Sequence, residues 1–204
     1  MESLKEIFEE MLNKEEQVTA QLAKDGNLYD GYPIELKNMH NKNADFFQTL
    51  LDNSEWPRIS DVGEETAKMA CAVFQHCAIC RPSLMKKGFE VISELAKLGE
   101  AHKQCVAYVS DRISYYERRP QKFGTQFEWN QNNEYGPWKI ENEKEINLRR
   151  KEMGLNTQEE HNANVSKHTP TDSAPSKTDY SDRENDFQKL LVSLGWLSQM
   201  EIME

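Results

Sequence analysis

The stretch Glu64–Ile79, EETAKMACAVFQHCAI, decides the fold. From residue 66 onward, its only polar side chains are those of Thr66, Lys68, Gln75 and His76. A helix that is apolar on nearly every side belongs in the interior of a domain, because none of its faces suits water. We therefore expect this helix at the centre, with the Gln75-His76 pair in its last turn.

Amphipathic patterns on both sides of this stretch predict the helices that surround it. We expect them at residues 3–23, 34–51, from Pro82 to about 98, from about 105 to 119, and at 143–153. Aromatic and polar residues alternate around an Asn-rich turn over residues 127–140, which is typical of a short β-hairpin. The predicted fold is mainly α: a single helical domain over residues 1–156, with a short hairpin in its C-terminal third.

The C-terminal tail divides into two parts. Residues 157–185 are rich in Ser, Thr, Pro and mixed charges, and this composition predicts a disordered linker. Residues 186–204 contain a short amphipathic docking helix. Its apolar side chains are Phe187, Leu190, Leu191, Leu194 and Leu197. A helix of about twelve residues is marginal in water, so we expect it to dock. Its own domain, a second copy of the chain and a separate protein partner all remain open as the surface it docks on.

The composition excludes several classes of partner. The chain has 204 residues and a formal net charge of −10, which argues against nucleic-acid or anionic-membrane binding. No apolar run approaches the ~18–20 residues that cross a bilayer. The N-terminus is acidic and lacks the features of a signal peptide, so a cytoplasmic protein is the expectation.

The four cysteines lie in predicted helices or at their ends, and we expect them to be free buried thiols. Cys77 and Cys80 form a single CxxC next to His76. A structural zinc site usually needs two such pairs, and a redox-active pair usually begins a helix, whereas this one ends a helix. We expect no metal and no cofactor.

Residues 105–126, CVAYVSDRISYYERRPQKFGTQ, hold the most unusual polar groups. Arg112 falls on an apolar stripe between Val109 and Ile113. Such an arginine either forms a structural ion pair, or reaches the rim of the core, or serves as a fixed clamp for an anion or carbonyl group. Pro120 ends the helix, and Gly124 permits a sharp turn. We expect this turn to hold Gln121, Thr125 and Gln126 beside Arg112.

Short motifs are spread along the chain: Trp56-Pro57, Val62-Gly63, Gln75-His76, Asp111-Arg112, Pro120-Gln121 and Phe123-Gly124-Thr125-Gln126, followed by Arg149-Arg150 and Gly154-Leu155. In this order they resemble the signatures of a bacterial helical domain family whose activity is unassigned. The resemblance covers roughly residues 1–158. The chain departs from the family pattern at Phe123, where tyrosine is usual, and at Glu16-Gln17 and Thr19 in the first helix. The resemblance implies positions of interest rather than a reaction.

Common phosphate-loop, metalloprotease and hydrolase motifs are absent from the sequence. The remaining polar residues predict a pocket for an anionic or amide-bearing small molecule or peptide. His76 and Asp111 are the candidate catalytic residues, with His76 as acid or base in a hydrolase or transferase. The candidate ligand-binding residues are Arg112, Gln121, Thr125, Gln126 and His40. Alternatively, His76 is a core histidine and the chain is a non-catalytic interaction module, of the adaptor, immunity or effector type.

Overall fold

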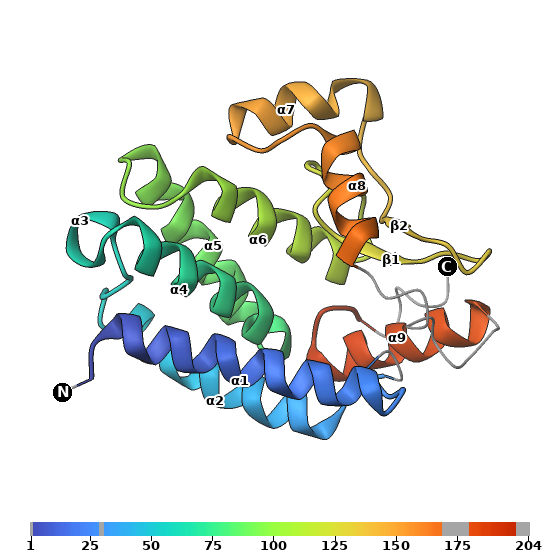
Figure 1. Ribbon diagram of the computed structural model, residues 1–204, viewed down its shortest axis with the longest axis horizontal. Coiled ribbons are helices and arrows are strands. Elements are labelled where there is room, and N and C mark those ends of the chain that lie inside the picture. Colours follow the sequence, from blue (N-terminus) through green and yellow to red (C-terminus); the bar gives the residue numbers. More distant parts are fainter. Residues whose placement is uncertain (1, 29–30, 169–179, 199–204) are drawn as a thin grey trace.

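The computed structural model describes residues 2–28, 31–168 and 180–198, and these form a mainly helical assembly with one hairpin (Figure 1). The helical elements are α1 (Leu4–Lys24), α2 (Ile34–Asp52), α3 (Ile59–Val62), α4 (Glu64–Cys77), the 3-10 turn η1 (Ala78–Cys80), α5 (Pro82–Lys97), α6 (Lys103–Tyr116), the 3-10 turn η2 (Glu143–Glu145), α7 (Ile146–Glu152), α8 (Gln158–His168) and α9 (Tyr180–Leu194). None of the described helices is long and apolar enough to cross a membrane.

Helix α4 lies at the centre, as its apolar sequence predicts, and packs against α1, α2, α3 and α6. Its inner side chains include Val73 and Phe74, both fully buried. Phe74 meets Phe47 of α2 and Trp56 edge-on, with ring centroids 5.2 and 5.1 Å away. Edge-on aromatic pairs add to the burial energy of the rings, so this cluster anchors α2 on α4.

Helix α1 begins at the expected place. The Ser3 side chain accepts from the Glu6 backbone N–H, and the Glu6 carboxylate accepts from the Ser3 backbone N–H. This reciprocal cap satisfies two donors that the first turn of a helix leaves open. Phe8, fully buried, stacks on Phe47 at 5.8 Å between ring centroids and fixes α1 against α2.

A disulfide joins Cys71 of α4 to Cys105 of α6, so the expectation of four free thiols is wrong for this pair. The two helices pack directly against each other, and the Cα atoms of the pair lie 5.9 Å apart, within the range that a disulfide spans. The two cysteines are 34 positions apart in the chain, so local sequence patterns do not predict that they lie close together. Cys77 and Cys80 are free thiols, as expected.

The predicted hairpin is present. Strands β1 (Phe127–Trp129) and β2 (Tyr135–Pro137) pair antiparallel, with Glu128 opposite Gly136. The turn between them is closed by Asn130, whose side-chain oxygen accepts from the backbone N–H groups of Asn132 and Glu134.

The predicted linker over residues 157–185 is wrong in its first and last parts. Thr157 and Glu160 cap α8 reciprocally, which starts a helix in a polar stretch. Gln158 then reaches the core, where it accepts from Arg150 and donates to the Gly124 carbonyl. Residues 180–185 form the first turns of α9, and residues 169–179 of the predicted linker lie outside the described part of the chain.

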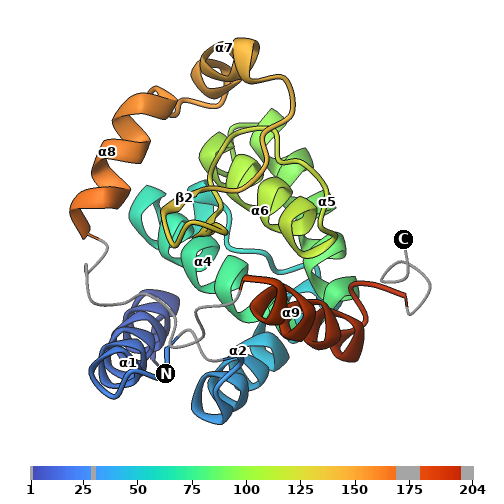
Figure 2. The same ribbon diagram turned by 90° about the vertical axis from the view of Figure 1, so that its right-hand side faces the viewer.

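Helix α9 docks on its own chain, near the C-terminal ends of α4 and α6 (Figure 2). Leu191 is fully buried, and the Trp196 indole N–H donates to the Ile79 carbonyl at 2.7 Å. Arg118 binds the N-terminal part of α9 through an ion pair with Glu184. The same guanidinium forms an ion pair with Glu128 and lies 3.8 Å from the Trp138 ring centroid. The tail therefore completes the core. Residues 199–204 of the predicted docking segment lie outside the described residues.

Candidate functional site

Asp111 organises the turn after α6. Its fully buried carboxylate accepts hydrogen bonds from the backbone N–H groups of Lys122, Phe123 and Thr125, at 2.8 to 3.1 Å, and from the Thr125 hydroxyl at 3.0 Å. Burial raises the pKa of Asp111, and the four donors oppose that rise. With its oxygens occupied by the turn, this carboxylate holds the backbone in place and has no free edge for a substrate.

The two glutamines of the turn are also paired within the protein. The Gln121 amide donates to the carbonyls of Gln126 and Trp138, and its oxygen accepts from the Gln126 backbone N–H. The Gln126 amide donates to the Thr125 hydroxyl. Gln121, Thr125 and Gln126 are all buried. The turn therefore forms a sealed polar cluster, in which these three predicted ligand-binding residues bind the protein itself.

Gly124 is indispensable to this turn for two reasons. Its φ of +66° lies in the left-handed region, and a Cβ at this position would approach the Gln158 Oε1 atom to 2.1 Å. Packing against Gln158 of α8 and a left-handed backbone thus explain the glycine of the Gly-Thr-Gln motif.

A second polar cluster lies where α1, α2, α4 and α6 meet, and we call it the Glu15 cluster: Glu15, His40, His76 and Arg112. The Glu15 Oε1 atom lies 2.9 Å from His76 Nδ1 and 3.8 Å from His40 Nε2. The Tyr32 hydroxyl lies 2.8 Å from His40 Nδ1. One carboxylate from α1 thus lies between a histidine of α2 and a histidine of α4. It brings together His40 and His76, two of the residues predicted for the site.

The charge state of the Glu15 cluster follows from its surroundings. Burial by itself raises the pKa of Glu15, but the hydrogen bonds and charges of His40 and His76 outweigh it and bring that pKa to about 2. Burial lowers the pKa of His76, helped by the nearby Arg112 charge and opposed by Glu15. At neutral pH, Glu15 is therefore an anion and His76 a neutral imidazole.

This charge state sets the tautomer of His76. An ionised carboxylate only accepts hydrogen bonds, so Nδ1 of His76 carries the proton that points at Glu15. The 2.9 Å contact departs from ideal hydrogen-bond angles, but Nδ1 is buried and has no other partner. About a third of the His76 side chain, 35 %, reaches solvent, whereas Nδ1 is buried. With the proton on Nδ1, the lone pair of the ring lies on Nε2.

Arg112 projects from α6 toward the same cluster, half-buried, and its charge acts on both His76 and the Tyr116 hydroxyl. Of the three alternatives for this arginine, the structural ion pair is not formed among the described residues: no carboxylate there bridges to the guanidinium, and its Nε atom is buried without a hydrogen-bond partner. A guanidinium usually gathers acceptors when it is taken from water. The Nε–H group of Arg112 is therefore an unused donor close enough to His76 for the arginine charge to act on it.

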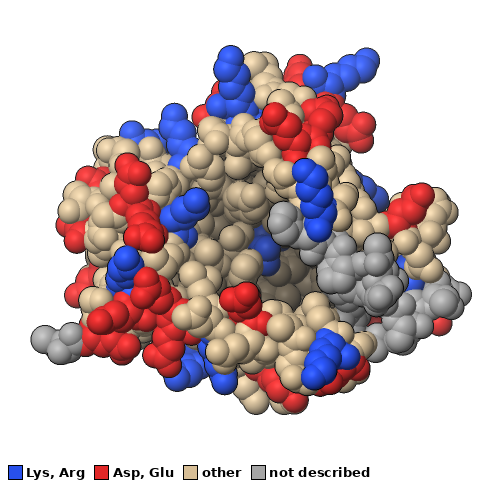
Figure 3. Space-filling view, viewed as in Figure 1, with Lys and Arg blue, Asp and Glu red and all other residues tan. Residues whose placement is uncertain are grey.

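The face of the molecule that α1, α4 and α8 border carries a hollow. Figure 3 shows this deep hollow with α6 beneath it, basic atoms at its depth and acidic atoms on the rim over α1. Several polar atoms on these helices and on α2 are buried without a hydrogen-bond partner, among them His40 Nε2, Gln75 Oε1, Arg112 Nε and His161 Nε2. Unpaired buried polar atoms are rare in proteins, and each calls for a partner such as a water molecule, an ion or a ligand, or for a functional role.

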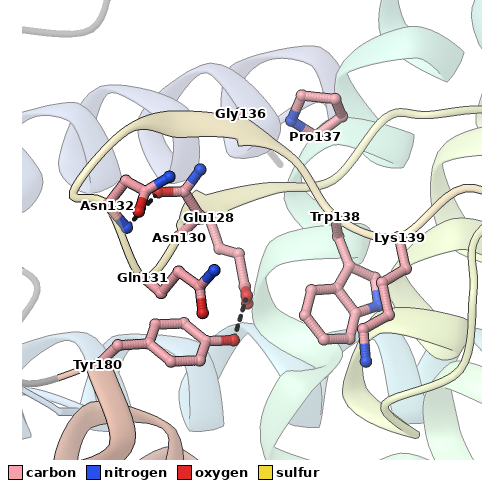
Figure 4. A pocket seen from close by; sticks show the side chains of 9 residues that line it. All are labelled: Glu128, Asn130, Gln131, Asn132, Gly136, Pro137, Trp138, Lys139 and Tyr180. Carbon is pink, nitrogen blue, oxygen red and sulfur yellow. Dashed lines mark hydrogen bonds between the residues drawn. The ribbon is translucent and has the colours of Figure 1, made fainter.

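Two recesses lie elsewhere. One, of about 370 Å³, is lined by the hairpin and α9, where the Tyr180 hydroxyl reaches Glu128 (Figure 4). Its Asn130 side chain is occupied by the hairpin turn. The other, of about 420 Å³, is a shallow acidic recess on α1. Neither contains a histidine or Arg112. We place the candidate site in the hollow because His76 and Arg112 combine an acid–base group with a guanidinium whose Nε has no partner among the described residues.

The free cysteines do not contribute to the site. Burial raises the pKa of the Cys77 and Cys80 thiols, so both remain protonated and weakly reactive at neutral pH. Within residues 2–28, 31–168 and 180–198, no group of three His, Cys, Asp or Glu side chains is arranged to hold a metal ion.

A comparison with known protein families, with curated proteins and with solved structures finds no match. The resemblance inferred from the short motifs therefore stays a prediction, and the function rests on the geometry of the Glu15 cluster.

Glu15 is the residue that the sequence analysis misses. It continues the apolar series of α1, one turn beyond Met11 and Leu12, so it stands at a core-facing position. An acid on such a stripe signals a buried partner in the same way as Arg112 does on α6.

Proposed function

We propose that the protein binds a small anionic molecule in the hollow and acts on it as a hydrolase or transferase. The observation that supports this proposal most strongly is Arg112: a half-buried guanidinium with an unpartnered Nε, set beside a neutral histidine that a carboxylate orients. Guanidinium suits phosphate and carboxylate groups, because its donors form a planar fork.

In this proposal, His76 is the general base. Glu15 holds Nδ1, so the lone pair of the ring lies on Nε2 and can take a proton from a water molecule or a hydroxyl group. The oxygen so activated attacks the phosphorus or carbonyl carbon of a bound ester, and the bond from that atom to the leaving oxygen breaks. The leaving oxygen takes the proton that His76 holds, while Arg112 balances the charge that develops. The positive imidazole that forms is stabilised by the Glu15 carboxylate 2.9 Å away. Asp111 has no part in this chemistry.

The sealed turn around Asp111 supports the second candidate, a non-catalytic interaction module. Its donors and acceptors are paired inside the protein, as expected of a polar cluster that specifies a fold. The two candidates differ at the Glu15 cluster, which is structural in the module and functional in the enzyme.

The first experiment titrates the full chain with inorganic phosphate and a small carboxylate such as acetate, followed by NMR signals of the histidine rings. We expect His76 signals to shift in the wild type, and the shift to disappear in Arg112→Gln. The matched control is Arg58→Gln, because Arg58 is exposed and lies away from the cluster on the short segment before α3.

His76→Gln then separates binding from catalysis. We expect this variant to keep the anion affinity and the melting temperature of the wild type, and to lose any hydrolysis of a phosphate or carboxylate ester found with the wild type. Unchanged anion binding in Arg112→Gln would refute the anion site. A large drop in melting temperature in His76→Gln, with no activity in the wild type, would support the interaction module.

A further inference from the structure

The hollow has a second side that the Glu15 cluster does not use. Tyr108 lies one turn before Arg112 on α6, so the two side chains share a face about 6 Å apart along the helix axis. His161 of α8 meets Tyr108 edge-on, with ring centroids 6.5 Å apart. Phe127 of β1 meets His161 in the same way at 5.3 Å. Three rings from three elements thus form one cluster, and Tyr108 links it to Arg112.

None of these three rings is fully buried. The Nε2 atom of His161 is buried without a hydrogen-bond partner among the described residues. Burial, together with the charge of Arg150, lowers the pKa of His161 to about 4, so the ring is neutral at physiological pH. It can therefore offer a hydrogen bond to an uncharged polar edge, and it does not compete with Arg112 for an anion.

We infer that the ligand of the hollow is a nucleoside monophosphate, whose phosphate binds Arg112 beside His76 and whose base lies against Tyr108 and His161. This inference rests on the anion site proposed above and names its substrate class. Aromatic side chains bind bases by stacking, and every base has a face that can stack. One helical turn between Tyr108 and Arg112 is a separation that a ribose bridges.

The ligand is a free nucleotide rather than a unit of a nucleic-acid chain. Binding of a polymer needs a basic surface that follows its backbone. This chain carries a formal net charge of −10, and Figure 3 shows both acidic and basic atoms around the hollow, with basic atoms at its depth. A small basic patch inside a hollow of an acidic chain suits one or two phosphates but offers no continuous basic path for a long polyanion.

The test compares ligands that share a phosphate and differ in the base. The full chain is titrated calorimetrically with inorganic phosphate, ribose 5-phosphate, and the monophosphates of adenosine, guanosine, cytidine and uridine. We expect at least one nucleotide to bind about tenfold or more tightly than ribose 5-phosphate, the size of effect that one stacked base provides. Tyr108→Leu should remove this advantage, and Tyr108→Phe should keep it, because the ring rather than the hydroxyl makes the contact.

The possible outcomes distinguish a failure of the base site from a failure of the anion site. If ribose 5-phosphate and all four nucleotides bind equally, and Arg112→Gln weakens them all, the base site is refuted and the anion site stands. If neither phosphate nor any nucleotide binds, the anion site itself fails. Tighter binding of a short single-stranded oligonucleotide than of every monophosphate would also overturn the inference. Inorganic phosphate checks the fold of each Tyr108 variant, since its affinity should not change there.

Discussion

Replacing Asp111 by Ala should destabilise the protein strongly, because this carboxylate holds the turn between α6 and β1. Four donors point at it: the backbone N–H groups of Lys122, Phe123 and Thr125, and the Thr125 hydroxyl. A hydrogen bond to a charged group contributes roughly 1.5–3 kcal/mol, but burial of the carboxylate offsets much of that sum. Removing one partner of a buried charged network costs about 3–5 kcal/mol, and we expect a loss of this size.

Urea unfolding, followed by circular dichroism, measures the free energy of unfolding of the variant against the wild type. Thr125→Ser is the matched control: it keeps the hydroxyl that donates to Asp111, and we expect a loss of about 1 kcal/mol or less. A loss below about 1 kcal/mol in Asp111→Ala would show that water replaces the carboxylate in the turn. If this variant instead kept its stability and lost activity, Asp111 would be catalytic and the structural argument would be wrong.

Three further predictions concern the Glu15 cluster, the C-terminal helix and the disulfide. Because the Glu15 pKa of about 2 lies below its usual 4.5, its carboxylate contributes about 3 kcal/mol that is fully present above pH 5 and lost as the pH falls toward 2. The stability gap between wild type and Glu15→Gln should close over that range in melts at stepped pH, and a pH-independent gap would contradict the pairing with His76. Arg118→Ala leaves Glu128 and Glu184 facing each other without their shared cation, so we expect a loss of roughly 3–5 kcal/mol. Hydrogen exchange should show α9 opening first, and unchanged protection there would refute the role of Arg118 in docking it. Cys71→Ser opens a disulfide that closes a loop of 34 residues, which should lower stability by roughly 3–4 kcal/mol, and dithiothreitol should have the same effect on the wild type but none on the variant.

The sequence predicts the helical core because local patterns carry that information. The apolar residues of 64–79 require an interior position, and α4 takes it. Ser3 and Glu6 lie three residues apart and form a capping box, so the sequence alone predicts where α1 begins. The sequence also predicts the hairpin, because its Asn-rich turn and its alternating aromatic residues are close together in the chain.

The tail shows where composition misleads. The polar stretch after residue 157 has too few apolar side chains to form a core of its own, which predicts disorder. It becomes helical because a capping pair starts α8, and because Gln158 finds partners in Arg150 and Gly124, residues that come before it in the chain. Helix α9 likewise docks on surfaces contributed by α6 and η1. Local sequence patterns do not predict contacts between residues that are far apart in the chain.

The sequence by itself determined which residues are costly to bury: His76 at a helix end, and Arg112 and Asp111 on α6. Only the tertiary structure decided their roles, because Asp111 and Arg112 are adjacent in the chain but leave α6 on different sides. Asp111 meets four donors of the turn and is fully used there. Arg112 meets His76, and Glu15 reaches His76 from a helix about sixty residues earlier in the chain. The partner that a buried charge finds depends on which helix packs against its face, and that is a property of the folded core.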